Sequence, residues 1–398
     1  MKKKSLKILA LALVASMLLT TNSTLADDTQ NNQVKIMSTT TSSEIQSPQA
    51  TEMTAEQEEK QTPSSPNATL RLSLEDAFKM IEAGNNTLKL TESKIAIYER
   101  QHEQAKARYD ANYAEADENS AKERRLNPKK TLWTLEDAKH DRDNQVKDLK
   151  VQIANQYQNI LALEQQAKNY EAQIKNVDTL IDQIKLQIDL GLSTESQIHA
   201  LNAQKSLLEA GLKAAQNSIK SSMIALKRDL GVDIDRQVIL TSDLVQYEKF
   251  KDSNIKELIA QAVENDYDRK RYEQDIELTQ IEYKIADDYS TGTADQLQIT
   301  IEDKKATLEA LPVTKEVSLR TAYNSLKSLE NSVEAAKLAV EADKINIEVM
   351  HKKIDAGVSS SIEIIELQNK LLNDQYTLLQ NIISYMTAVS NFENSLEN

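Results

Sequence analysis

The chain contains no cysteine, and it is poor in the residues that interrupt helices, with six glycines and five prolines among 398 residues. The absence of cysteine excludes disulfides, thiolate metal sites and a lipid anchor attached at a cysteine. Aromatic residues make up only 4%. Charged residues reach 28%, and Ala, Leu, Ile, Gln, Lys and Glu are abundant, which is a composition typical of long helices and coiled coils.

Long apolar runs are also scarce. The most prominent one, 8–19, follows a cluster of lysines and precedes a small-x-small motif at Thr24 and Ala26. Such a run is too short to span a bilayer, and its flanks fit a cleavable leader. We therefore expect residues 1–26 to be a secretory signal peptide. No later segment reaches about 18 uncharged apolar residues, so we expect no transmembrane helix after it.

The charge balance is acidic. The formal net charge is −14, and removal of the predicted leader takes away four lysines and no acid, which leaves −18. Phosphate binding needs a basic patch, so we expect no nucleic acid partner. The segment 27–69 is rich in Ser, Thr and Pro and lacks apolar periodicity. We expect it to be a disordered tail.

From residue 70 onward, apolar residues recur at steps of three and four, the spacing of coiled-coil helices. This pattern predicts a helix to about 115 with a bend at 84–86, and a long helix over 133–190. A returning helix is expected between Gly191 and Gly231, which makes an antiparallel hairpin.

The same order then recurs, with a connector at 232–253, a helix over 254–288 and a second long hairpin that turns at Gly357. The turn Ile-Asp-Leu-Gly-Leu-Ser at 188–193 matches Ile-Asp-Ala-Gly-Val-Ser at 354–359, at an offset of 166 residues. Self-similarity of this kind indicates an internal duplication. We expect two helical repeats, 70–231 and 232–398.

Two polar stretches separate the paired helices of each repeat. They cover 117–132 and 290–311, and we expect both to be non-helical gaps, with Pro312 in the first turn of the helix that follows. A lipid-facing strand hairpin needs two strands of about 9–11 residues with alternating apolar faces. The charged sequence at 117–125 cannot supply such a face.

No catalytic set is visible. The four histidines stand singly and are expected to be surface or helix-seam residues: His102, His140, His199 and His351. Asp and Glu are spread along helix faces, and no glycine-rich loop could cradle a phosphate. We therefore expect no enzyme activity, no metal site and no cofactor.

Two features remain as candidate sites. The turns at Gly191 and Gly357 are explained by the preference of glycine for helix ends, or they are a repeated docking tip. Glu363 and Glu366 share one helix face just after the second turn. They form either a solvated face, with Lys370 as the partner of Glu366, or a functional acidic cluster.

The duplicated plan, the opening Leu-Ser-Leu-Glu-Asp-Ala at 72–77 with Gly-Asn-Asn at 84–86, and the Gly-Leu/Val-Ser turns resemble the TolC-type outer-membrane efflux factors. The resemblance covers about 72–396. It implies an all-α fold of long coiled-coil hairpins, three copies of which close into a helical tube. It also implies a periplasmic adaptor (membrane-fusion) protein and an inner-membrane transporter as partners.

The resemblance assigns roles to particular residues. Family members dock the adaptor at their hairpin turns, which here are Gly191, Leu192, Ser193, Gly357, Val358 and Ser359. Their tip constriction carries acidic residues six and nine positions after the second glycine, which here are Glu363 and Glu366. The first-repeat position is Gln197, and the position that is basic in the best-known members is Ser359, so the family's gate bonds are not fully matched.

The main departure concerns the two polar stretches, where family members carry the strand hairpins of a membrane barrel. We expect that barrel to be absent or vestigial. The protein is expected in the cell envelope, at the outer membrane by family or as an extracytoplasmic or cell-wall component. The favoured function is an efflux duct, and the alternative is a secreted coiled-coil structural or adhesive protein without a pore.

Overall fold

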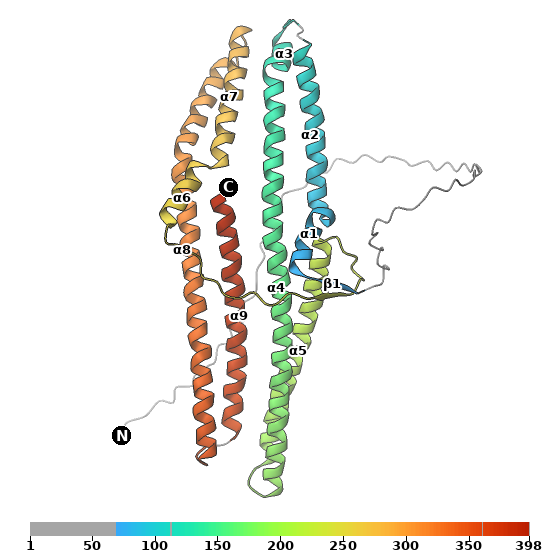
Figure 1. Cartoon of the computed structure of the whole chain (residues 1–398), viewed down its shortest axis with the longest axis vertical. Coiled ribbons are helices and arrows are strands. Elements are labelled where there is room, and N and C mark those ends of the chain that lie inside the picture. Colours follow the sequence, from blue (N-terminus) through green and yellow to red (C-terminus); the bar gives the residue numbers. More distant parts are fainter. Residues whose placement is uncertain (1–68, 112–113, 360, 398) are drawn as a thin grey trace, which may run out of the picture. The chain divides into compact units, whose positions relative to one another are not determined.

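The computed structural model describes residues 69–111, 114–359 and 361–397, which belong to one compact unit (Figure 1). The predicted leader 1–26 and, apart from Thr69, the predicted tail 27–69 lie outside these residues. The fold of the described part consists of long helices, as the sequence predicts, together with one pair of very short strands.

The first half of the described chain is a long antiparallel hairpin with shorter helices packed on its first arm. Its elements are β1 (Leu70–Leu72), α1 (Leu74–Gly84), α2 (Asn86–Asp110), α3 (Glu118–Ala121), the π-helical turn η1 (Lys122–Leu126), α4 (Asn127–Asp189) and α5 (Glu195–Asp229). α4 and α5 form the hairpin, and α2 runs along the opposite end of α4. The predicted bend at 84–86 is present, because α1 ends and α2 begins on either side of Asn85.

The second half repeats this arrangement. Its elements are β2 (Val238–Leu240), α6 (Ile255–Glu264), α7 (Tyr267–Asp288), α8 (Ala294–Asp355) and α9 (Ser361–Glu397). α8 and α9 form the second hairpin, and α7 packs along the end of α8 that α9 leaves free (Figure 1).

Both predicted gaps are wrong in extent. In the described part of the first gap, helix runs from Glu118 through η1 into α4, which begins at Asn127 instead of 133. α8 begins at Ala294, so Pro312 lies inside it and not in a first turn. The reason is that Glu, Lys, Arg, Gln and Ala are good helix formers, so a few apolar residues are enough to pack these stretches. Ala121, Leu126 and Ile301 are such residues, and all three are buried.

The two halves build equivalent cores. Residues that occupy the same positions at an offset of 166 are buried in both, namely Ile153 and Leu319, Ile160 and Leu326, and Ala167 and Val333. The shorter helices follow an offset of 181, since α1 starts at Leu74 and α6 at Ile255. Burial of these apolar side chains is the main stabilising term for helices with so little other support.

A strand pair ties the start of the first half to the segment that follows it. β1 and β2 are parallel, with Leu70, Arg71 and Leu72 opposite Val238, Ile239 and Leu240. Tyr157 of α4 is fully buried beneath them, donates its hydroxyl to the carbonyl of Leu72 at 2.8 Å and accepts from the N–H groups of Thr241 and Ser242. The pair therefore anchors the first core.

Two different seams join the halves. The contacts between α4 and α9 include buried amides, with Asn169 donating to the carbonyl of Leu372 at 3.1 Å and Gln173 to Asn373 at 3.2 Å. Between the α4 end and α7 the contacts are ionic, and they include Lys270 with Glu136 at 3.0 Å. Because Asn169 and Gln173 are each 3% exposed, the amide seam is dry and fixes the pairing of the hairpins.

Candidate functional site

The two hairpin turns have the same backbone geometry. In the first, Gly191 has φ +73°, its N–H donates to the carbonyl of Ile188 at 2.8 Å, and that of Leu192 donates to Gln187 at 2.8 Å. In the second, Gly357 has φ +71°, and the corresponding bonds reach Ile354 and Lys353 at 2.9 Å. These are Schellman ends, which require a left-handed residue directly after the helix. The matched motif in the sequence thus encodes a matched fold.

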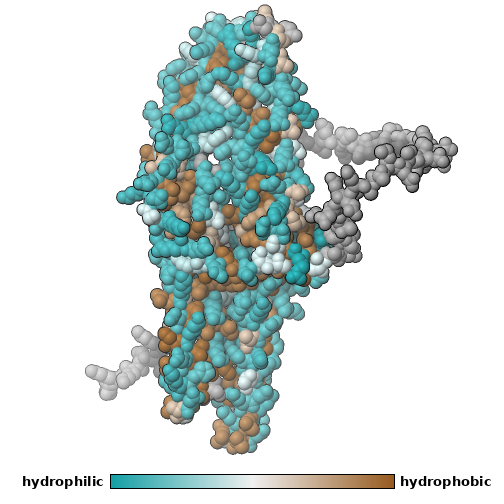
Figure 2. Space-filling model, viewed as in Figure 1, coloured by the Kyte–Doolittle hydropathy of each residue, from teal (hydrophilic) through white to brown (hydrophobic). Residues whose placement is uncertain are grey.

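The turns expose apolar side chains. Leu192 is 75% exposed and Val358 is 72% exposed, and the first tip adds Leu186 at 61% and Leu190 at 65%. Hydrophobic residues gather at the lower end of the view in Figure 2, where the two hairpins turn. Exposed apolar residues in one group are unusual on a soluble surface and typical of a binding surface. Ser193 and Ser359 are half-buried, and Ser193 bonds to Gln197 within its own turn.

Glu363 and Glu366 are exposed at the start of α9. No ion pair or hydrogen bond to another described residue involves either carboxylate. Lys370, the partner expected for Glu366, instead donates hydrogen bonds to Asp343 of α8 at 2.7 Å and to Asp374 at 2.7 Å. These bonds, to Asp343 first, raise the pKa of Lys370. The predicted Glu366–Lys370 pair is therefore wrong, and both glutamates keep their charge uncompensated by the described residues.

The residues between the glutamates fix their position. Ile364 and Ile365 are each 7% exposed and pack with Leu180 of α4 in a small cluster near the turns. α9 therefore cannot rotate freely here, since doing so would expose two isoleucines. The carboxylates on either side are held on the surface by the burial of their neighbours.

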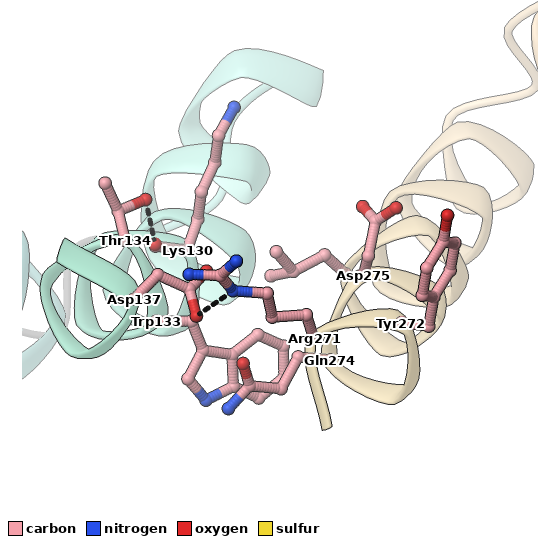
Figure 3. A pocket seen from close by; sticks show the side chains of 9 residues that line it. Lys130, Trp133, Thr134, Asp137, Arg271, Tyr272, Gln274 and Asp275 are labelled. Carbon is pink, nitrogen blue, oxygen red and sulfur yellow. Dashed lines mark hydrogen bonds and ion pairs between the residues drawn. The ribbon is translucent and has the colours of Figure 1, made fainter. Parts of the chain in front are cut away.

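The opposite end of the molecule carries a groove between α4 and α7. Its volume is about 360 Å³, and Arg271 extends across it from α7 to Asp137 on α4 at 3.3 Å (Figure 3). Its lining is Lys130, Trp133, Thr134, Asp137, Arg271, Tyr272, Gln274, Asp275 and Leu278. Arg271 pairs with Asp137, and Lys130 and Asp275 add one charge of each sign to the lining, so the groove presents no field of one sign to a charged ligand.

His140 lies beside this groove in a stacked pair. Its ring is 3.5 Å from that of Tyr267 with 9° between the planes, and it bonds to Asn144 at 2.9 Å. Burial and the nearby Arg271 lower the pKa of His140. Burial and the hydrogen bond to Asp137 raise the pKa of Tyr267 to about 12. This histidine is thus a seam residue, as predicted, and the stack joins the two halves.

Two features are absent from the part of the chain that is described. Its His, Asp and Glu residues nowhere gather in a group that could hold a metal ion. Among the same residues, no helix combines the length and the apolar character needed to cross a bilayer.

Several residues of the site region were not found from the sequence. Asp343 and Lys370 form its most buried ionic contact, and Asn169 and Gln173 join its hairpins. The sequence held one signal for the contact between Asp343 and Lys370, because an Asp and a Lys lie 27 residues apart across each hairpin turn. The buried amides had no such signal, since glutamine and asparagine also populate exposed helix faces.

The comparisons agree with this geometry at the level of fold. No protein-family model matches the chain, and no curated protein matches it in sequence. Among solved structures, the outer membrane protein VceC of Vibrio cholerae is similar with a TM-score of 0.64 at 12% identity, over 81% of this chain and 95% of that one. The CmeC outer membrane channel of Campylobacter jejuni gives 0.60 at 11% identity over 81% and 85%.

A third structure is the MtrE outer membrane channel of Neisseria gonorrhoeae in its open state, with a TM-score of 0.61 at 11% identity, over 81% of this chain and 88% of that one. At these identities the likeness shows the fold alone. The expected fold of TolC-type helical channels is confirmed on that basis.

Proposed function

We propose that this chain is the subunit of an exported TolC-like efflux duct, which closes as a homotrimer and docks an adaptor protein of a tripartite transporter at its hairpin turns. The proposal rests on two helix faces that have no partner in the described chain. By the internal repeat, they are the counterparts of the two faces that pack together between the hairpins. The fold of outer membrane channels supports it.

Within the chain, α4 packs on α9 through Asn169, Gln173 and their partners. At the offset of 166 residues, α8 is the counterpart of α4, and α5 is the counterpart of α9. α5 and α8 do not pack along one another in the described chain. An internal repeat that uses one of two equivalent interfaces leaves the other for a neighbouring copy, and head-to-tail contacts of this kind close into rings.

The composition of these faces fits that role. α8 offers the small residues Ala335, Ala339 and Ala342 where α4 has Asn169, Gln173 and Asn176, which permits a close helix approach. Leu338 lies next to Ala339 on α8 and is 70% exposed, and Leu207 of α5, the counterpart of Asn373 at the offset of 166, is 74% exposed. Covering them in a trimer would bury apolar surface that the single chain leaves in water.

The site residues then take their places in the ring. Leu192 and Val358, on matched turns, are the apolar contacts for the adaptor. Glu363 and Glu366 of three copies would form six carboxylates near one end, an acidic constriction that acts on solutes by charge. The duct would be passive, with the energy supplied by the inner-membrane transporter, and no cofactor is required.

The assembly test is the mass of the leaderless protein in solution. Light scattering after gel filtration should give three copies, and Leu207→Asp or Leu338→Asp should give a single copy with unchanged helicity. Ile234→Asp is the control, since Ile234 is 55% exposed in the segment after α5 and lies on none of the helices that form a seam between the halves. A wild-type monomer, or a trimer in both α5 and α8 variants, would favour the alternative of a coiled-coil structural protein without a pore.

Docking is tested separately. Leu192→Glu with Val358→Glu should abolish binding of the cognate adaptor, measured by pull-down with purified proteins, while the trimer persists. Both side chains are exposed, so each change should alter folding stability by less than about 0.5 kcal/mol. Full binding by the double variant would remove the docking assignment and leave the duct itself untouched.

A further inference from the structure

Two helices at the end opposite the hairpin turns carry exposed apolar residues. On α2, Leu90 is 57% exposed and Ile97 is 47% exposed, and their spacing of seven residues puts them on one face of the helix. On α8, Ile299 is 53% exposed. α2 and α8 do not pack along one another in the described chain, and α4 and α7 lie between them (Figure 1). The assignments made so far give these three residues no contact.

The internal repeat shows which helices these faces would meet. α7 is the counterpart of α2, because the two helices begin 181 residues apart and Ala105 and Ala286 are both buried at that offset. α8 is the counterpart of α4 at the offset of 166, and Leu135 and Ile301 are both buried at this end of the two helices. Inside the chain, α7 packs against α4. The counterpart contact, α2 against α8, is not made inside the described chain, so two copies can make it.

One ion pair of the contact between α4 and α7 recurs at the counterpart positions. Lys270 of α7 pairs with Glu136 of α4 at 3.0 Å. Their counterparts are Lys89 of α2 and Glu302 of α8, so both charges are repeated. Both of these side chains are exposed, and neither has an ion-pair partner among the described residues. Each is therefore available to the other in a neighbouring copy.

The two faces also differ in the sign of their charge. Lys94 lies one helical turn beyond Leu90 on α2, and Asp303 lies one turn beyond Ile299 on α8. Both are exposed, and neither forms an ion pair with a described residue. The α2 face is thus basic and the α8 face acidic. Complementary charge of this kind favours contact between the two faces and opposes contact of either face with itself.

Apolar residues occupy the positions between these charges. Trp133 of α4 and Leu278 of α7 line the same groove inside the chain. Their counterparts are Ile299 of α8 and Ile97 of α2, so apolar side chains would again lie across from each other. Covering these side chains removes apolar surface from water, which is favourable.

Two replacements make the α2 and α8 version of the contact more apolar than the version inside the chain. Arg271, which extends across the groove, is replaced by Leu90. His140, which stacks on α7, is replaced by Ala306. A guanidinium group and an imidazole ring thus give way to a leucine and an alanine. Apolar residues at the centre with charged residues around them are the usual composition of an interface between proteins.

We propose that α2 of one copy packs against α8 of the next copy and forms a second interface of the ring, beyond the α5 and α8 faces near the hairpins. Lys89 pairs with Glu302 of the neighbouring copy, and Leu90 and Ile97 cover Ile299. The occupant is a second copy of this chain, because α4 and α7 of the chain itself are the template for the contact. The inference rests on the proposed ring and identifies a further surface that closes it.

Charge reversal tests the pairing. In a dilution series of the leaderless protein followed by sedimentation velocity, Lys89→Glu and Glu302→Lys should each raise the midpoint concentration of trimer dissociation by about tenfold or more, because like charges then face each other. The double variant should recover most of the loss, since the charges are opposite again. Lys106→Glu is the matched control and should associate as wild type. Lys106 is exposed on α2, and nine residues or about two and a half turns separate it from Ile97, which puts it on the opposite side of the helix.

Position is tested by crosslinking. The chain has no cysteine, so Ile97→Cys with Ile299→Cys places one thiol on each face. A short bismaleimide should link the double variant into covalent products of two and three copies, and neither single variant should be linked. Linked pairs from Ile97→Cys alone would show that α2 meets α2 across a two-fold axis, and would overturn the proposal.

The remaining outcomes separate this interface from the duct itself. A wild-type monomer would remove the ring and this interface together. A wild-type trimer whose dissociation is unchanged by both charge reversals, or whose double-cysteine variant is not linked, would overturn the α2 and α8 interface and leave the duct in place. If Lys89→Glu left the trimer unchanged but abolished pull-down of the adaptor, the α2 face would belong to the adaptor, and the proposal would equally be overturned.

Discussion

Lys370 of α9 donates hydrogen bonds to both carboxylate oxygens of Asp343 on α8, at 2.7 Å and 2.9 Å. The Asp343 side chain is 3% exposed, so Lys370 takes the place of water as its hydrogen-bonding partner. The first hairpin carries a similar bridge, one residue out of register with the offset of 166, with Lys205 of α5 donating to Asp178 of α4 at 2.7 Å across an equal span of 27 residues. Asp178 differs in being 47% exposed.

This difference in burial predicts different costs for the same substitution. Lys370→Met should lower the free energy of unfolding by about 1–3 kcal/mol, because Asp343 is left buried and unpaired. Lys205→Met should have little effect, because water replaces the lysine at Asp178. Urea unfolding followed by circular dichroism measures both. Equal losses in the two variants would show that burial of the aspartate does not decide the cost.

Two glycines should respond very differently to alanine. A Cβ on Gly84 would lie 2.0 Å from the carbonyl oxygen of Leu230, so Gly84→Ala forces the backbone of α1 away from the end of α5. A loss of about 3 kcal/mol is expected from such overpacking. Gly357→Ala meets no atom within 4 Å and bears only the strain of φ +71°, about 1 kcal/mol. Thermal unfolding of the two variants checks the order, and a more damaging Gly357→Ala would contradict it.

Much of this fold could be predicted from the sequence, because the helical hairpins follow from a period of three to four residues and from two matched turns. The turns themselves were specified by glycine at the one position that needs a positive φ. What the pattern missed was helix at 118–132 and 294–311, where buried apolar residues such as Leu126 and Ile301 are few and separated by polar ones. The helix propensity of those polar residues continues the helices between the buried contacts.

The roles of the candidate site residues stay predictions, and one ion pair expected among them was wrong. Glu363 and Glu366 lie on the surface as expected, yet Lys370 bonds to Asp343 and not to Glu366. An i,i+4 rule considers one helix, whereas the buried carboxylate on the neighbouring helix attracts the lysine more strongly. Contacts between helices decide such pairs, and a single sequence does not give them.

Acidic pH should weaken the contact between α4 and α7 that contains His140. Burial lowers its pKa in the folded state, so the unfolded chain binds the proton more readily. The stabilising contribution is present above the unfolded pKa of about 6.5 and is lost as the pH falls below it. Asp137, Asp141 and Asp143 on α4 and Arg271 on α7 face the ring, and the cation opposes the charge that the three acids favour.

The test is His140→Phe, which keeps an aromatic ring against Tyr267 and removes the titration. The melting temperature of wild type should fall between pH 7.5 and pH 5.5 by more than that of the variant. His199→Phe, at an exposed residue of α5, should behave as wild type. If His140→Phe and wild type lose the same amount, the pH dependence comes from other groups.

The last prediction concerns Glu363 and Glu366 in the assembled ring. Both are exposed, and no described residue pairs with them, so in a single chain their removal should change stability by less than about 0.5 kcal/mol. Six carboxylates gathered near one end of a duct would instead attract cations and set selectivity. The double change Glu363→Gln with Glu366→Gln separates these situations, since it removes charge and keeps size. In planar-bilayer or vesicle recordings of the complete assembly, the variant should lose cation preference and any block by multivalent cations, with the trimer intact by light scattering.

Glu348→Gln, on the exposed face of α8 where Glu348 pairs with Lys352 at 2.7 Å, is the matched control and should conduct as wild type. A double variant whose selectivity and block equal those of wild type, in an intact trimer, would place both carboxylates in bulk water and end their assignment as a constriction.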